Sequence, residues 1–378
     1  MTKINKNIMR NYIKKCLFIF AISLTVISCS DVVTYNDNWD DELTSFESPS
    51  ITDIMSPTQN TSISEVVFDD SINVVGDNLT GVKSIVINDI EVDLLTIYAT
   101  RHKITLSIPR EIPLEISNTI TVVTNLGQAS YPLFVSIPEI KVDGLYNEFA
   151  LPGDTVQIIG SNFDLYNLIE ENTVISYNGE TVNATNFTSN SIDIVIPLNA
   201  VNNTKFVLSS PKVTNPIDIS YRNEGYLLFD FDNYSDRYVT DGSKAGDPIA
   251  LKGSFIRMAG SFAAWSYTNL FAKNYTISDQ DILDNPQNYY FVFEVYTSSS
   301  ESVSTNDQIK FNNNIWDPNG NSTPLNTYDT WRTMRMEVAD AFPNSGTYAL
   351  GKRFFLLCQP KSERDFDFSM ANFRLVKK

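Results

Sequence analysis

Short segments that alternate apolar and polar residues fill most of the chain beyond its first fifty residues, and they limit what it can fold into. Segments such as KITLSIP (103–109) and SIDIVIP (191–197) place every second side chain on one face, which is the period of a half-buried β-strand. Asn, Asp, Gly, Pro and Ser separate these segments, and long helical periodicities are almost absent. The chain is therefore predicted to be all-β, with two or three domains.

The middle of the chain contains the same order of segments twice. The matching segments are 71–92, 103–109 and 118–130 in the first copy, and 153–164, 172–182, 191–197 and 205–213 in the second. Each copy also has a glycine two residues before an asparagine, Gly76 before Asn78 and Gly160 before Asn162, which suits a turn or bulge after a strand. The repetition predicts two tandem sandwich domains, at residues 48–136 and 137–221.

These two copies resemble immunoglobulin-like IPT/TIG domains. The resemblance rests on the Gly-x-Asn step, on the hairpins Ile87-Asn88-Asp89 and Tyr177-Asn178-Gly179, and on the strand pattern I-x-I-x-I-P. The second copy fits better, because the first lacks both a phenylalanine after Asn78 and the glycine of the hairpin. The resemblance implies Ig-like spacer domains, and we expect them to form a stalk, since a fold alone assigns no function.

The composition changes after Tyr221, where an aromatic-rich module begins. Residues 223–378 hold three of the four tryptophans. Alternating segments predict strands at 289–296, 308–311, 331–338, 353–358 and 366–376. Their spacing predicts a third domain at residues 222–378, a jelly-roll-like β-sandwich.

The N-terminus has the layout of an export signal. Five basic residues precede a short apolar run, CLFIFAISLTVI (16–27), which is too short for a membrane span and predicts a signal peptide at residues 1–28. The run closes on VISC, which resembles a bacterial lipobox and implies cleavage before Cys29 and lipidation of its thiol. Residues 29–47 are acidic and poor in apolar side chains, so we expect a flexible tether. An acidic segment after a lipidated cysteine also resembles an export signal for display on the outer face of the outer membrane.

This order of parts resembles the surface glycan-binding lipoproteins of polysaccharide-utilisation loci. The shared motifs in the last module are LLFDFDN (227–233), WSYTNLF (265–271), YYFVFEVYT (289–297), WRTMRMEV (331–338) and DFSMANFRLV (367–376). The resemblance implies a non-catalytic protein that captures polysaccharide or oligosaccharide through its terminal β-sandwich. It also implies an outer-membrane lipid anchor facing the cell exterior, and an outer-membrane glycan transporter complex as a partner.

Charge and residue counts exclude several other classes of function. Residues 1–28 hold five basic and no acidic residues, so their removal changes the net charge from −17 to −22, which opposes binding to nucleic acid. With Cys29 lipidated, the mature chain keeps Cys358 alone, in an apolar strand where we expect a buried thiol. The single histidine, His102, rules out a cluster of histidine ligands, and we expect it at the surface. No cofactor and no metal is predicted.

Aromatic side chains in polar loops are the candidate ligand contacts. A sugar ring has an apolar C–H face that a flat aromatic ring covers, while neighbouring polar side chains bind its hydroxyls. Trp265 and Tyr267 lie two residues apart in a Ser- and Asn-containing loop, and Trp316 and Tyr328 lie in a second polar loop region. These four residues are predicted to bind the glycan. Trp331 begins an alternating strand and is predicted to pack in the core.

Three alternatives remain open from the residues alone. A glycosidase would need two carboxylates in one cleft, for which Glu294 and Glu337 are the candidates. A structural adhesin or stalk would bind a protein partner and use the aromatic residues as ordinary core. A structural calcium ion would need oxygen ligands, for which the candidates are Asp230, Asp232, Asp365 and Asp367. Carboxylates that are solvated or bonded to the backbone are the favoured interpretation of these four residues.

Overall fold

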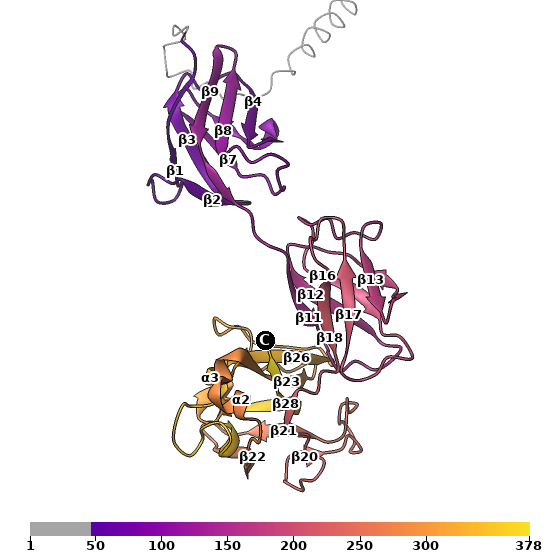
Figure 1. Ribbon diagram of the computed structural model, residues 1–378. Coiled ribbons are helices and arrows are strands. Elements are labelled where there is room, and N and C mark those ends of the chain that lie inside the picture. Colours follow the sequence, from indigo (N-terminus) through magenta and orange to yellow (C-terminus); the bar gives the residue numbers. More distant parts are fainter. Residues whose placement is uncertain (1–46) are drawn as a thin grey trace, which may run out of the picture. The chain divides into compact units, whose positions relative to one another are not determined.

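The structure is a computed structural model that describes residues 47–378 (Figure 1). Its regular secondary structure is almost entirely β-strand, which confirms the predicted class. They form two compact units, one ending at Glu139 and one spanning Ile140–Lys378. The predicted signal peptide, Cys29 and nearly all of the tether lie outside the described residues. Within the described part of the chain, none of the helices has the length and apolar character to cross a membrane.

The first unit is a sandwich of two four-stranded antiparallel sheets with an added strand pair. One sheet has the order β1-β3-β7-β6 and the other β5-β4-β8-β9, while β2 and β10 pair in parallel. Apolar side chains on alternate positions of both sheets, such as Ile72, Ile85 and Ile104, are fully buried between them. The strands are β1 Ser50–Met55, β2 Glu65–Val67, β3 Ser71–Asp77, β4 Val82–Ile87, β5 Ile90–Glu91, β6 Tyr98–Ala99, β7 Lys103–Ser107, β8 Thr119–Thr124, β9 Gly127–Pro132 and β10 Phe134–Ser136, with the 3-10 helix η1 at Leu94–Thr96.

The second unit begins with another sandwich of the same design. Its sheets have the orders β11-β12-β16-β15 and β14-β13-β17-β18, and they enclose a core that includes Ile158, Phe163 and Phe206. The strands are β11 Lys141–Leu145, β12 Thr155–Ser161, β13 Val174–Tyr177, β14 Glu180–Thr181, β15 Ala184–Thr185, β16 Ser191–Val195, β17 Thr204–Ser209 and β18 Ile217–Tyr221. The repeat seen in the sequence is thus a repeat of structure.

The Gly-x-Asn step has the same physical role in both sandwiches. A Cβ on Gly76 would lie 1.8 Å from the carbonyl oxygen of Ser50, and one on Gly160 would lie 2.1 Å from that of Lys141. Only glycine permits this close approach of β3 to β1 and of β12 to β11, next to a bulge in each pairing. The asparagine two residues later has a left-handed backbone in both copies, with φ of 57° at Asn78 and 64° at Asn162.

We expect Gly160→Ala to destabilise the second unit by about 2–3 kcal/mol, because the new methyl group overlaps a backbone carbonyl that cannot move without breaking the sheet. Urea unfolding measures the loss. Gly179→Ala is the control: no atom lies within 4 Å of the added Cβ there, and only the left-handed backbone penalty of about 1 kcal/mol remains. Equal losses in the two variants would contradict the steric reading.

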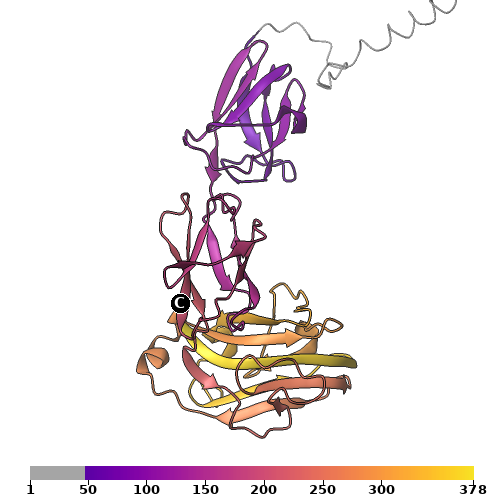
Figure 2. The ribbon, with the colours of Figure 1, turned by 90° about the vertical axis from the view of Figure 1, so that its right-hand side faces the viewer.

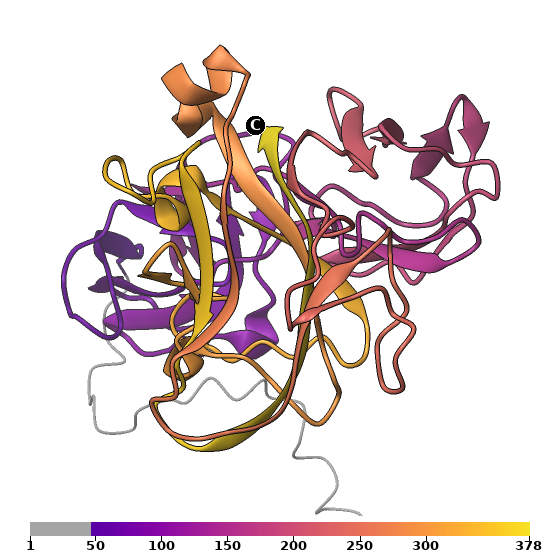
Figure 3. The ribbon, with the colours of Figure 1, turned by 90° about the horizontal axis from the view of Figure 1, so that it is seen from below.

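The C-terminal part of the second unit is a larger sandwich of two sheets (Figure 2). One sheet has the order β20-β21-β28-β23-β26, with β19 also paired to β28, and the other has the order β22-β27-β24-β25. The long strands β23 and β28 lie side by side through its middle (Figure 3). The strands are β19 Tyr226–Phe229, β20 Val239–Thr240, β21 Phe255–Phe262, β22 Thr268–Asn274, β23 Tyr289–Thr297, β24 Lys310–Phe311, β25 Asn314–Ile315, β26 Trp331–Glu337, β27 Arg353–Cys358 and β28 Arg364–Lys377, and the helices are α2 Gln280–Asp284, η2 Pro286–Asn288, η3 Thr305–Asp307 and α3 Val338–Ala341.

A buried charge network joins this sandwich to the preceding one. The guanidinium of Arg374, with no exposed surface, donates to both carboxylate oxygens of Glu294 at 2.9 and 3.0 Å. Glu148, which follows β11 in the preceding sandwich, lies 3.5 Å from Arg374 and accepts from Arg335 at 2.8 Å. Two carboxylates thus face two guanidiniums, and Asn372 donates to Glu294 as well. The two positive and two negative charges cancel, and the hydrogen bonds and ion pairs between them link the two neighbouring sandwiches.

We expect Arg374→Met to lower the stability of the second unit by about 3–5 kcal/mol, since it leaves Glu294 buried without its main counter-charge. The shift of the urea unfolding transition measures this. Arg353→Met changes an exposed arginine of the same sandwich and is expected to stay within about 0.5 kcal/mol of the parent. Near-identical transitions for both variants would show that the network contributes little.

Candidate functional site

The predicted ligand contacts separate into three places. Trp265 and Tyr267 lie together on the turn between β21 and β22, and both are exposed, by 56% and 63%. Tyr328 lies before β26 and is 70% exposed. Trp316 is 4% exposed and belongs to the main core. Trp265 and Tyr267 therefore form one surface, while Tyr328 belongs to another.

The prediction that Trp316 contacts the ligand is wrong. Its ring packs edge-on against Phe293, with centroids 5.4 Å apart, and against Phe311 at 6.0 Å. Asn312 and Asn313 have left-handed backbones that reverse the chain after β24. This reversal returns the next segment over the core, and the indole fills space between the sheets. The prediction for Trp331 is confirmed, because that ring is buried against Phe255.

Trp265 is held outward by a strained backbone. Its φ of 59° lies in the left-handed region, which is unusual for a bulky residue and costs on the order of 1–3 kcal/mol. Its amide donates to the carbonyl of Pro360 at 2.7 Å, and Ser266 closes a turn onto Ala263. The indole is thus exposed in a strained conformation, and such outliers cluster at functional sites.

Tyr267 rests on an aromatic layer that sequence reasoning missed. Its ring lies 6.2 Å from that of Phe355 at an interplanar angle of 29°, and Tyr348 lies 5.8 Å from Phe355 at 26°. Phe354 and Leu356 face the core, so Phe355 faces the outside of the sheet. The run RFFLLC, apolar at every position after its arginine, was the available signal, since an ordinary half-exposed strand would alternate. We call Trp265, Tyr267, Tyr348 and Phe355 the aromatic platform.

Polar side chains lie on the same outer face as the platform. Asn269 and Lys310 are the cross-strand partners of Leu357, which shares the face of Phe355. The ammonium of Lys310 donates to the side chain of Gln359 at 3.1 Å. The face therefore combines flat apolar rings with amide and ammonium groups, which suits a ligand with an apolar side and a hydroxylated rim.

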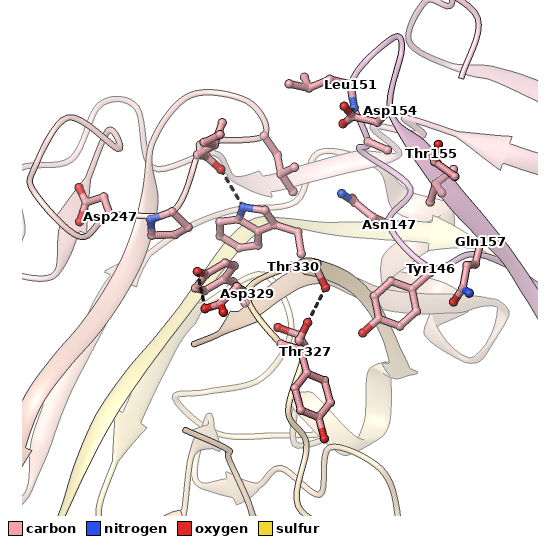
Figure 4. A pocket seen from close by; sticks show the side chains of 18 residues that line it. Tyr146, Asn147, Leu151, Asp154, Thr155, Gln157, Asp247, Thr327, Asp329 and Thr330 are labelled. Atoms are coloured by element: carbon pink, nitrogen blue, oxygen red, sulfur yellow. Dashed lines mark hydrogen bonds between the residues drawn. The ribbon is translucent and has the colours of Figure 1, made fainter. Parts of the chain in front are cut away.

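Tyr328 lines a pocket of about 870 Å³ elsewhere in the second unit (Figure 4). One wall comes from β12 and the segment before it, with Tyr146, Thr155 and Gln157. The other wall comes from the segment before β26 and from the loop around Ile249. Trp331 lines the pocket too, and its indole N–H donates to the carbonyl of Ile249 at 2.8 Å.

The proposed pair of catalytic carboxylates does not have glycosidase geometry. Glu294 pairs in register with Thr333, and Glu337 with Tyr290, so the two lie four positions apart, about 13 Å along the sheet. Glycosidase pairs lie about 5–9.5 Å apart. Burial raises the pKa of Glu294 against the opposing charge of Arg374, and its side chain has no exposed surface for a substrate to reach. Glu294 belongs to the buried charge network, whereas Glu337 is exposed and pairs with Lys378.

Three of the four aspartates considered as calcium ligands, Asp230, Asp232 and Asp367, have partners within the protein. Asp367 binds Arg257, Asp232 accepts from the amide of Ser254, and no group of three or more metal-binding side chains occurs within residues 47–378. Burial raises the pKa of the Cys358 thiol to about 12, in agreement with the predicted core position. His102 is exposed as predicted and lies beside Asp77.

Residues 221–377 match the family profile described as "Surface glycan-binding protein B xyloglucan binding domain". The resemblance predicted from the motifs is confirmed. The matched range contains the whole aromatic platform, whereas one wall of the pocket lies outside it.

The chain is also similar to a curated protein sequence and to solved structures of surface glycan-binding proteins. An IPT/TIG domain-containing protein of Bacteroides ovatus is 30% identical over 152 residues, which cover 38% of this chain and 30% of that protein. The chain thus spans under a third of this curated relative. The crystal structure of surface glycan-binding protein PbSGBP-B from Prevotella bryantii is similar with 17% identity and a TM-score of 0.49, covering 87% of this chain and 99% of that one. SGBP-B from a complex xyloglucan utilization locus in Bacteroides uniformis is similar with 15% identity and a TM-score of 0.42, covering 88% of this chain and 100% of that one.

Proposed function

We propose that this chain is a non-catalytic glycan-binding protein of the cell surface, and that its aromatic platform binds a neutral polysaccharide of the xyloglucan class. The observation that carries the proposal is the exposure of Trp265 and Tyr267 on one strained turn, inside the range that matches the glycan-binding family. An exposed indole in a strained conformation does not stabilise the fold. Contact with a ligand that covers the ring would account for its position.

Elementary energetics supports a polysaccharide ligand. Covering about 100 Å² of apolar ring surface contributes roughly 2.5 kcal/mol, and part of this is lost to ordering of the ligand. One platform therefore gives modest affinity for a short oligosaccharide. A long polymer reaches many copies of the protein on one cell, and this multivalency raises the overall affinity without any new contact.

Trp265→Ala and Tyr267→Ala are each expected to weaken binding of xyloglucan by about 1–3 kcal/mol, because each removes apolar contact area. Isothermal titration on protein spanning residues 30–378 measures the loss, and the unfolding transition should hardly move. Trp316→Ala is the matched control, with about 3–5 kcal/mol lost from stability and, in the folded fraction, binding retained. Full affinity in the folded Trp265→Ala and Tyr267→Ala variants would move the site to another face.

The anchoring part of the proposal rests on the sequence VISC at 26–29. Cys29→Ala is expected to abolish fatty-acid labelling, because it removes the thiol that carries the lipid. It should also shift the protein from the membrane fraction to the soluble one. Cys358→Ala, which removes a buried thiol, should leave both readouts unchanged. Unchanged labelling after Cys29→Ala would exclude lipidation at this position.

A further inference from the structure

We infer that the pocket beside Tyr328 is a second saccharide site, which binds a short stretch of neutral glycan independently of the aromatic platform. This inference rests on the proposed function, since it assigns a further site for the same class of ligand. The pocket volume of about 870 Å³ falls in the range of small-molecule sites. The walls come from both sandwiches of the second unit, so the site needs residues outside the range that matches the glycan-binding family.

The aromatic side of the pocket is rigidly mounted. Tyr328 and Asp329 both have left-handed backbones, with φ of 51° and 61°, so two consecutive residues carry strain. Thr327 and Thr297 exchange two hydrogen bonds of 2.8 Å, and the amide of Asp329 donates to the carbonyl of Thr297 at 3.0 Å. The loop is thereby fixed to the end of β23, yet it leaves the ring of Tyr328 mostly exposed. This combination of strain and exposure is the one found at Trp265.

The opposite wall supplies unused hydrogen-bonding groups. Within residues 47–378, the side chains of Thr155 and Gln157 make no hydrogen bond, and both are exposed on β12. Tyr146 lies beside them, its amide bound to Gln157 and its carbonyl to the amide of Thr333 (Figure 4). The guanidinium of Arg332 lies 5.4 Å from the centre of the Tyr146 ring and fixes its position. A sugar with one face on an aromatic ring therefore meets free donors and acceptors at its rim.

The charges of the pocket select a neutral ligand. Among the described lining residues there is no lysine or arginine, and the three charged ones are carboxylates: Asp154, Asp247 and Asp329. Hydrogen bonds from Ser299 hold the pKa of Asp329 below its ordinary value, so it is ionised at neutral pH. Asp247 already binds Arg257 at 2.7 Å, and Asp154 accepts from the amide of Leu151. A uronic acid is repelled, a cation finds no unpartnered carboxylate, and a neutral saccharide can still donate hydroxyls to them.

Fluorine NMR on protein labelled with 5-fluorotryptophan tests the inference, because Trp331 lines the pocket and Trp316 does not. The experiment uses residues 30–378 carrying Trp265→Ala and Tyr267→Ala, which removes the two most exposed rings of the platform. The probe is a xyloglucan-derived oligosaccharide. We expect the Trp331 resonance to shift during the titration and the Trp316 resonance, of similar burial, to stay in place. An oligogalacturonate of equal length should shift neither.

Further substitutions in this background assign the effect to the pocket. Tyr328→Ala and Gln157→Ala are each expected to weaken the residual binding about tenfold, whereas Gln287→Ala, an exposed glutamine outside this pocket, should leave it unchanged. If the parent binds the oligosaccharide but Trp331 does not respond in the platform variant, the second site is excluded and the proposed function stands. If the parent binds no neutral glycan at all, both proposals fail.

Discussion

Arg374 places a full positive charge where water cannot reach it, and the architecture of the second unit follows from how that charge is satisfied. An unpaired buried guanidinium costs several kcal/mol, so its neighbours must supply counter-charge and acceptors. Glu294, on the next strand, accepts two hydrogen bonds from the guanidinium, and the centre of the Phe149 ring lies 4.7 Å from the guanidinium carbon. Glu148 completes the balance from the preceding sandwich. The sheet that contains β23 and β28 therefore carries charged side chains on its outer face, and this face is buried only when the preceding sandwich packs on it.

The outer faces of the two sheets of the C-terminal sandwich therefore make different contacts. The outer face of the sheet containing β23 and β28 is used for attachment, through the charge network and through Phe149, Phe255 and Trp331. The outer face of the sheet containing β22 and β27 is not used in this way, and it carries the aromatic platform. Removing residues 140–221 would expose the charge network but would leave the platform residues in place. The attachment contacts and the proposed glycan-binding platform thus lie on opposite faces of one sandwich.

Periodicity predicted what depends on neighbours in the sequence and failed where distant segments meet. The all-β class, the repeat and the core position of Trp331 follow from alternation within single strands. Trp316 was misplaced because its polar neighbours suggested a surface loop, while left-handed asparagines return that loop over the core. The pairing of Glu148 with Arg335 joins residues 187 positions apart, and no local pattern encodes it. The pocket was missed for the same reason, although Tyr328 itself was selected.

The two surfaces share a physical principle that explains why strain appears at both. A flexible loop that ordered its aromatic side chains only on binding would lose rotamer freedom of about 0.5–1.5 kcal/mol for each one, a large fraction of what one stacked sugar contributes. Trp265 and Tyr328 instead hold left-handed backbones within fixed hydrogen-bond frames, anchored to Pro360 and to Thr297 respectively. The ordering cost is met during folding, by the stability of the sandwich core. At the two proposed glycan sites, a weak stacking contact would then contribute most of its free energy to binding, and several such contacts along one polymer would add up.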